Sequence, residues 1–234
     1  MSRIDLVTAS KAGPLTGLML RIARRKTKQL TGRETEQMIG PVEAYAHLPR
    51  LLFGYAMLED ATAKLDRVPE PLKVLAELKA ATLTSCEYCI DIGSQIARRS
   101  GLSDEQLLAL PRYRESEHFD EPQRLVLDYA VGMSRTPVEV PDELLDELRA
   151  HFDDAQLVEL TNVIALENMR GRFNLALGFG SAGFSDGMVC ALPEPAAVAE
   201  TATTAARAAA GPARPAAGPA AATDTQKVAA GTQA

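Results

Sequence analysis

Apolar residues recur at three- and four-residue spacing along most of the chain, which is the pattern of amphipathic helices. Leu15, Leu18 and Ile22 form one such stripe near the start of the chain. The pattern predicts helices in residues 15–22, 51–65, 72–83, 120–134, 140–152 and 153–178. None of these segments alternates in the two-residue period of a strand. The sequence therefore predicts an all-α protein.

Helix-start signals support this interpretation. The helix at residues 120–134 is expected to begin at Asp120, with Pro122 in its first turn. The helix at 140–152 carries acidic residues early and Arg149 late, which suits the helix dipole. The longest helix is expected to end at the glycines from Gly178 onward.

The last 44 residues differ sharply in composition from the rest of the chain. They contain 19 alanines, five prolines and three glycines, and no Phe, Tyr, Ile or Met. Such a segment has too little bulky apolar surface to offset the entropy of ordering it. We therefore expect an N-terminal helical extension at residues 1–48, a helical domain at 49–190 and a disordered tail at 191–234.

Composition and charge narrow the classes of function. The chain has 234 residues and a net charge of −6, which disfavours a nucleic-acid-binding protein. It has no apolar run of about 18 residues, so no membrane span is predicted. The first residues lack the features of a secretory signal. A cytoplasmic protein without a bound cofactor is expected.

Two of the three cysteines, Cys86 and Cys89, lie in the segment "LTSCEYCIDIGSQ" at C-x-x-C spacing. The residues Thr84 to Glu87 match a capping box, which predicts a helix from Thr84 through Arg99. Both sulfurs would then share one face of its first turns. A helix N-terminus favours a thiolate, which is the reactive form of cysteine.

Metal and haem sites fit this cysteine pair poorly. Structural zinc needs four ligands, and Cys190 is about a hundred residues away. The three histidines, His47, His118 and His151, show no ligand spacing. Haem attachment needs a histidine directly after the second cysteine, where Ile90 stands. A redox pair and two inert buried cysteines remain as the alternatives.

The segment "LKAATLTSCEYCIDIGSQIARRSGLSDEQL" resembles the carboxymuconolactone decarboxylase-like superfamily, in its alkylhydroperoxidase D-like redox branch. The resemblance extends from about Pro49 to Gly183. It implies an all-α helical bundle that assembles as trimers or hexamers. It also implies that Cys89 attacks a peroxide, that Cys86 resolves the sulfenic acid, and that an external dithiol or thioredoxin-like protein returns the electrons.

The sequence departs from the family pattern at two positions. The redox branch has a histidine four residues after the second cysteine, where this chain has Gly93. Gly93 is expected to leave space beside Cys89, and the nearest side chains with proton capacity are Asp91 and Glu87. The family's glutamate position is occupied by Val74. Glu77 lies about one helical turn later and is the candidate base.

The polar run at residues 167–174, "ENMRGRFN", is expected to serve subunit contacts or a buried network rather than catalysis. The leading hypothesis is a thiol peroxidase that uses Cys89, Cys86 and Glu77. One alternative is a decarboxylase-like enzyme acting on an unknown small molecule without a redox pair. The other is an oligomeric protein that uses the disulfide as a non-catalytic switch.

Overall fold

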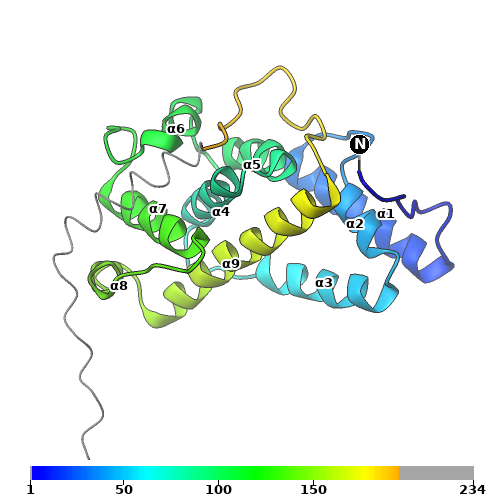
Figure 1. Ribbon diagram of the computed structural model, residues 1–234, viewed down its shortest axis with the longest axis horizontal. Helices are drawn as coiled ribbons and strands as arrows, with labels where there is room; N and C mark the ends of the chain where they lie inside the picture. The colour runs from blue at the N-terminus through cyan, green and yellow to red at the C-terminus, as the bar shows by residue number, and fades with distance from the viewer. Residues whose placement is uncertain (1, 195–234) are drawn as a thin grey trace, which may run out of the picture.

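A computed structural model describes residues 2–194 of the chain, and all of the regular elements in this range are helical. Figure 1 shows the helices in order: α1 (Pro14–Thr31), α2 (Gly40–Tyr45), α3 (Pro49–Thr62), α4 (Glu70–Thr84), α5 (Glu87–Arg99), α6 (Asp104–Ala109), the 3₁₀ helix η1 (Leu110–Arg112), α7 (Glu121–Ser134), α8 (Asp142–Arg149) and α9 (Asp154–Leu177). The predicted all-α class is confirmed. Within the described range, no helix is long and apolar enough to cross a membrane.

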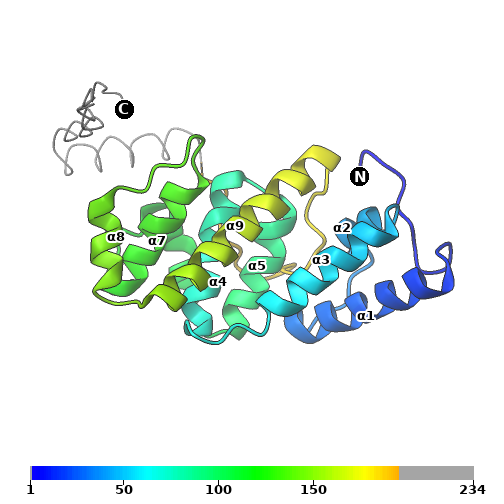
Figure 2. The same cartoon turned by 90° about the horizontal axis from the view of Figure 1, so that it is seen from below.

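Helix α4 lies in the middle of the bundle and packs against α5, α7 and α9. The two views show α8 and α7 toward one end of an elongated molecule and α1 toward the other (Figures 1 and 2). A helix covered on several sides cannot keep a purely polar face. Accordingly, α4 buries Ala76 and Ala80 toward α9 and α7, and Leu75 and Leu78 toward α5.

The residues before α4 form their own apolar cluster against α5 and α9. Leu20 of α1, Leu52 of α3 and Met38 are almost fully buried in it. Phe184, from the segment after α9, completes this cluster and is 0% exposed. The region predicted as an N-terminal extension is therefore packed onto the bundle.

Several helix boundaries agree with the sequence prediction. Asp120 caps α7 and Asp153 caps α9, each in a capping box with the glutamine three residues later. Helix α9 ends at Gly178, which adopts the left-handed conformation with φ 74°. The short helices α2 and α6 were not predicted from the apolar pattern. They have six residues each, which is too short to show a helical period clearly.

The predicted capping box at Thr84 is wrong, because Thr84 is the last residue of α4. Its hydroxyl donates back to the carbonyl oxygens of Ala80 and Ala81, each at 3.1 Å. The side chain is also pressed against α9, since a Cβ atom at Gly171 would lie only 2.7 Å from Thr84 Oγ1. Packing between α4 and α9 thus keeps Thr84 helical and overrides the local signal.

Residues 179–194 return across α4 and α5 after α9 ends. Asp91 of α5 anchors this segment by accepting hydrogen bonds from Ser181 Oγ and from the backbone N–H groups of residues 182, 184 and 185. Ala191 donates to Ser94 Oγ at 3.0 Å. Two of the first four residues of the predicted tail, Ala191 and Glu194, are therefore buried on the bundle, whereas Leu192 and Pro193 are exposed. The remaining residues of the predicted tail lie outside the described range.

Glu194 makes a buried ion pair with Lys79 of α4. Lys79 is 1% exposed; its ammonium group also donates to the carbonyl oxygen of Leu110 and lies over the Tyr113 ring. Thr82 Oγ1 donates to the same carboxylate at 2.8 Å. Burial lowers the pKa of Lys79, and the Glu194 carboxylate opposes that effect.

Changing Glu194 to Ala should destabilise the fold, because it leaves the Lys79 ammonium buried without a counterion. Breaking a buried ion pair typically costs about 3–5 kcal/mol. Denaturant unfolding measures the loss, and Glu147→Ala, an exposed carboxylate on α8, is the matched control. Equal stability of the two variants would contradict the structural role of this pair.

Candidate active site

Cys86 and Cys89 form a disulfide at the start of α5. Ser85 adopts a left-handed conformation with φ 54° and ends α4, and Cys86 caps the N-terminus of α5. Cys86 Sγ accepts the backbone N–H of Cys89 at 3.3 Å. The predicted helix start was two to three residues early, but the pair does lie where a helix N-terminus stabilises negative charge on sulfur.

The side chain of Asn174 on α9 reaches both sulfurs. Its Nδ2 donates to Cys89 Sγ at 3.4 Å and to Cys86 Sγ at 3.7 Å. All three residues are buried, with exposed fractions of 0% for Cys86, 4% for Cys89 and 3% for Asn174. The sequence placed Asn174 in a polar run with a structural role, so its contact with the sulfurs was missed.

Gly93 leaves less room beside the pair than the sequence predicted. A Cβ atom at this position would lie 3.1 Å from Leu78 Cδ1, so Leu78 occupies part of the space. Asp91 is committed to the hydrogen bonds that hold residues 181–185. Glu87 is exposed at the start of α5.

Glu77 belongs to a cluster of charged residues between α3, α4 and α9. Arg170 binds three carboxylates: Glu77 at 3.0 Å, Glu167 at 3.0 Å and Glu59 at 2.6 Å. The second oxygen of Glu167, Oε1, is buried and has no hydrogen-bond partner in the described part of the chain. We call these four residues the Arg170 cluster. It lies near the sulfurs along α9, because Arg170 and Asn174 are one helical turn apart.

The charges of the Arg170 cluster do not balance, since three carboxylates face one guanidinium group. Burial raises the pKa of Glu167 to about 7, and the neighbouring Glu77 carboxylate adds to the shift. Burial also raises the pKa of Glu77, against the attraction of Arg170. Burial also tends to raise the pKa of Glu59, but Arg170 holds the pKa of that carboxyl below its ordinary value. The cluster therefore binds a proton near neutral pH.

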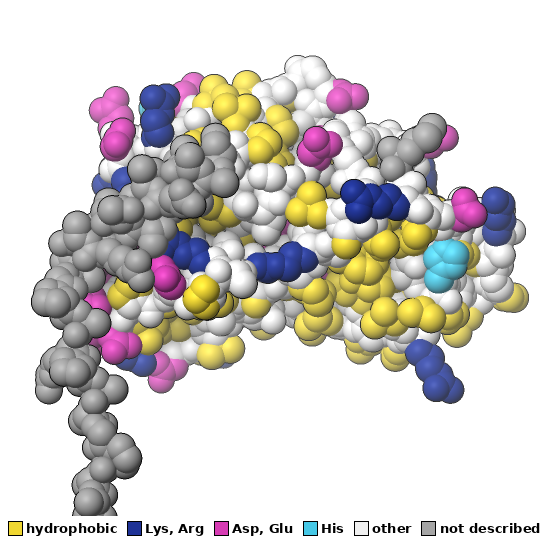
Figure 3. Space-filling view, viewed as in Figure 1, with side chains coloured by type: hydrophobic (Ala, Val, Ile, Leu, Met, Phe, Trp, Pro, Cys, Tyr) yellow, Lys and Arg dark blue, Asp and Glu magenta, His cyan; other side chains and the backbone are white. Residues whose placement is uncertain are grey.

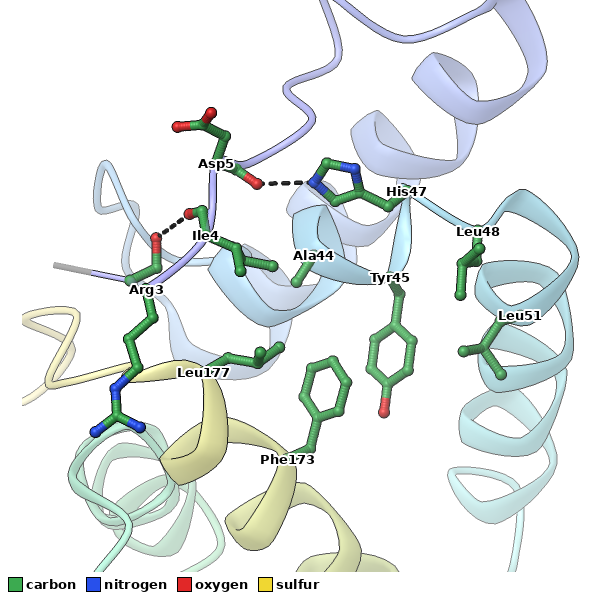
Figure 4. Close-up of a pocket in the computed structure, with 11 residues that line it drawn as sticks. Arg3, Ile4, Asp5, Ala44, Tyr45, His47, Leu48, Leu51, Phe173 and Leu177 are labelled. Atoms are coloured by element: carbon green, nitrogen blue, oxygen red, sulfur yellow. Dashed lines mark hydrogen bonds between the residues drawn. The ribbon is translucent and has the colours of Figure 1, made fainter.

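A separate open recess of about 660 Å³ lies between α2, α3, the end of α9 and the first residues of the chain. The rings of Tyr45 and Phe173 stack with their centroids 4.3 Å apart, and the two side chains line the recess side by side (Figure 4). Hydrophobic side chains gather on the surface over α2, α3 and the end of α9 (Figure 3). Neither cysteine lines this recess.

Metal ligation has no support among residues 2–194, where no group of three or more His, Cys, Asp or Glu side chains is arranged to hold an ion. Cys190 is a free cysteine, with its sulfur 3.4 Å from Ser94 Oγ. The chemistry available at the site is thus the disulfide itself, an amide donor at both sulfurs and a proton-binding cluster nearby.

Sequence comparison identifies the family. Residues 31–131 match the carboxymuconolactone decarboxylase family. The Escherichia coli protein YnjA, which is described as uncharacterised, is 35% identical over 167 residues, which cover 69% of this chain and 87% of YnjA. The chain therefore belongs to the carboxymuconolactone decarboxylase family.

Solved structures extend the comparison to the fold. The debrominase Bmp8 in complex with 2,3,4-tribromopyrrole has a TM-score of 0.64 and 19% identity, covering 88% of this chain and all of that chain. An alkylhydroperoxidase AhpD core, a peroxidase-related protein from Ralstonia eutropha, has a TM-score of 0.62 and 17% identity. The match covers 78% of this chain and 94% of the Ralstonia chain. These similarities confirm the predicted alkylhydroperoxidase D-like helical fold.

The Arg170 cluster should make stability depend on pH through Glu167. Its pKa is about 7 in the folded state and 4.5 as the ordinary value, so the folded state keeps a proton that the unfolded chain loses in that range. The contribution of this bound proton to the free energy of unfolding is complete below pH 4.5 and is lost as the pH rises through 7. The shift corresponds to about 3 kcal/mol at most.

Glu167→Gln keeps a neutral side chain at every pH. Compared with the wild type, its stability should therefore rise by about 1–3 kcal/mol between pH 5 and pH 8, as measured by denaturant unfolding. Glu147→Gln provides the control for losing an exposed carboxylate. A difference between Glu167→Gln and the wild type that stays constant with pH would show that Glu167 is already ionised at pH 5.

Proposed function

We propose that this protein is a thiol-dependent oxidoreductase that reduces peroxides through a dithiol–disulfide cycle of Cys86 and Cys89. The observation that carries the proposal is the disulfide at the N-terminus of α5 with the Asn174 amide donating to both sulfurs. Two inert core cysteines would need neither a shared polar donor nor a helix N-terminus. The alkylhydroperoxidase D-like fold supports the same class of chemistry.

The cycle has an oxidising half and a reducing half. The Cys89 thiolate attacks one peroxide oxygen, the O–O bond breaks, and an alcohol leaves with a proton while Cys89 becomes a sulfenic acid. Cys86 then attacks that sulfur, forming the disulfide and releasing water. An external dithiol returns two electrons and two protons, and is itself oxidised to a disulfide. Each turn thus converts a peroxide and a dithiol into an alcohol, water and a disulfide.

We assign proton exchange to Glu77 within the Arg170 cluster. The family's usual histidine is replaced by Gly93, and Asn174 can donate a hydrogen bond but cannot take up a proton. Burial raises the pKa of Glu77, and it raises the pKa of the neighbouring Glu167 to about 7. A carboxyl group that holds a proton near neutral pH suits general acid–base catalysis. The described contacts of Glu77 are to Arg170, so its effect on sulfur passes through the cluster.

Reduced protein should consume a stoichiometric amount of peroxide, with at least one thiol reacting faster than free cysteine. Cys89→Ser should abolish this rapid phase, because the attacking sulfur is removed. Cys86→Ser should keep the attack but stop at the sulfenic acid, which a sulfenic-acid trapping reagent reports. Stopped-flow mixing with an alkyl hydroperoxide measures the rates.

Cys190→Ser is the control for this experiment, because Cys190 is a free cysteine outside the pair. It should leave the rapid phase unchanged. If the reduced wild-type protein reacts no faster than free cysteine, the peroxidase assignment is wrong. A disulfide that then forms reversibly, with a change in assembly state on size exclusion, would favour the redox-switch alternative.

Replacing Glu77 by Gln should slow peroxide oxidation of the reduced protein. General acid–base catalysis typically contributes about 10²–10⁴-fold, and we expect the lower end because two other carboxylates remain in the cluster. The control is Glu147→Gln, which removes an exposed carboxylate on α8. Equal rates for both variants would assign Glu77 a structural role only.

A further inference from the structure

The two sulfurs of the disulfide have unequal numbers of hydrogen-bond donors. Cys86 Sγ faces two donors, the backbone N–H of Cys89 at 3.3 Å and Asn174 Nδ2 at 3.7 Å. Among residues 2–194, Cys89 Sγ faces one donor, Asn174 Nδ2 at 3.4 Å. Cys86 also holds the N-cap position of α5, where the helix dipole acts most directly.

These donors contribute little while the disulfide is intact, because neutral sulfur is a weak acceptor. A hydrogen bond to a charged acceptor is roughly twice as strong as one between neutral groups. Breaking the disulfide puts negative charge on a sulfur that is already aligned with its donors. The site is therefore organised in advance for a thiolate, and no reorientation of Asn174 is needed.

We propose that Asn174 and the Cys89 N–H together stabilise the Cys86 thiolate, so that Cys86 is the more acidic thiol and the leaving group when the disulfide is opened. This inference rests on the proposed function and concerns the same pair. Asn174 contacts the reacting atoms and stands in for the missing histidine as a donor, although not as a proton carrier.

This division of roles agrees with the chemistry of thiol exchange. An external thiolate attacks Cys89 Sγ and forms a new S–S bond, while the Cys86–Cys89 bond breaks and its electron pair moves to Cys86 Sγ. A sulfur of lower pKa leaves faster, and a sulfur whose pKa lies near ambient pH is the better nucleophile. Cys86 fits the first role and Cys89 the second.

Other charged groups around the pair must be separated from the effect of Asn174. Helix α5 contributes the exposed Glu87 and the anchored Asp91. Helices α4 and α9 contribute Glu77, Glu167 and Arg170 of the cluster. All of these groups are unchanged when Asn174 is substituted, so a variant at Asn174 isolates the amide.

The test measures the pH midpoint of thiolate formation by its ultraviolet absorbance in single-cysteine proteins, with Cys190 also replaced by Ser, because Cys86 is too buried for an alkylating reagent to reach. In the Cys89→Ser background, which keeps the backbone N–H at 89, Cys86 should ionise with a midpoint below about 8.5, the value of an ordinary cysteine. Asn174→Ala should raise that midpoint by about one to two pH units, since hydrogen bonds to charged groups contribute about that much. Asn174→Asp should raise it further by charge repulsion.

Two comparisons make the outcome decisive. In the Cys86→Ser background, the Cys89 midpoint should be higher than that of Cys86, because Cys89 Sγ lacks the backbone donor that Cys86 Sγ has. Asn174→Ala should raise the Cys89 midpoint as well, since Asn174 Nδ2 lies 3.4 Å from Cys89 Sγ. Asn168→Ala, which removes another buried asparagine of α9, should leave both midpoints unchanged. Asn174→Asp preserves the side-chain shape and serves as the informative variant if Asn174→Ala does not fold by circular dichroism.

An unchanged Cys86 midpoint in the Asn174 variants would overturn the proposal, and so would an equal rise in Asn168→Ala. A lower midpoint for Cys89 than for Cys86 would reverse the assigned roles. No peroxide is used in this measurement. A protein that fails as a peroxidase can therefore still confirm the thiolate assignment, and the reverse outcome is equally distinguishable.

Discussion

The geometry of the site depends on one backbone conformation, the left-handed turn at Ser85. An L-residue pays roughly 1–2 kcal/mol to adopt this conformation, so the packing on both sides must hold it. Ser85 ends α4 directly before Cys86, and the chain starts α5 at once. Cys86 becomes the cap, and both sulfurs lie at the positive end of a helix. A longer connection would move the pair away from α9 and from Asn174.

Much of the fold could be predicted from the apolar pattern and the caps. Asp120 and Asp153 begin helices as their sequences indicate, and Gly178 ends α9. The same kind of local prediction failed at Thr84, because the side chain packs against Gly171, which lies more than eighty residues later in the sequence. A capping motif describes only its own turn of chain, whereas tertiary packing decides where a buried helix stops.

The cysteine pair was visible in the sequence, but its surroundings were not. Asn174, Glu167 and Arg170 lie in a polar run on α9, and spacing along one helix does not reveal which partner helix that face meets. Glu77 was predicted as the candidate base, and the contact of its carboxylate with Arg170 could not be seen in the sequence. The three carboxylates around Arg170 come from residues as far apart as 59 and 167, so only the folded structure shows that their charges do not balance.

The aromatic residues give the N-terminal half a distinct optical character. The chain has no tryptophan and five tyrosines. Tyr45 is stacked between Tyr55 and Phe173, at 4.4 and 4.3 Å, and Tyr88 packs into the same apolar cluster. Near-ultraviolet circular dichroism and tyrosine emission therefore respond to how α2 and α3 dock on α5 and α9, in addition to the signals of Tyr113 and Tyr129 elsewhere in the bundle. Loosening of that docking is visible spectroscopically even where the helices themselves remain intact.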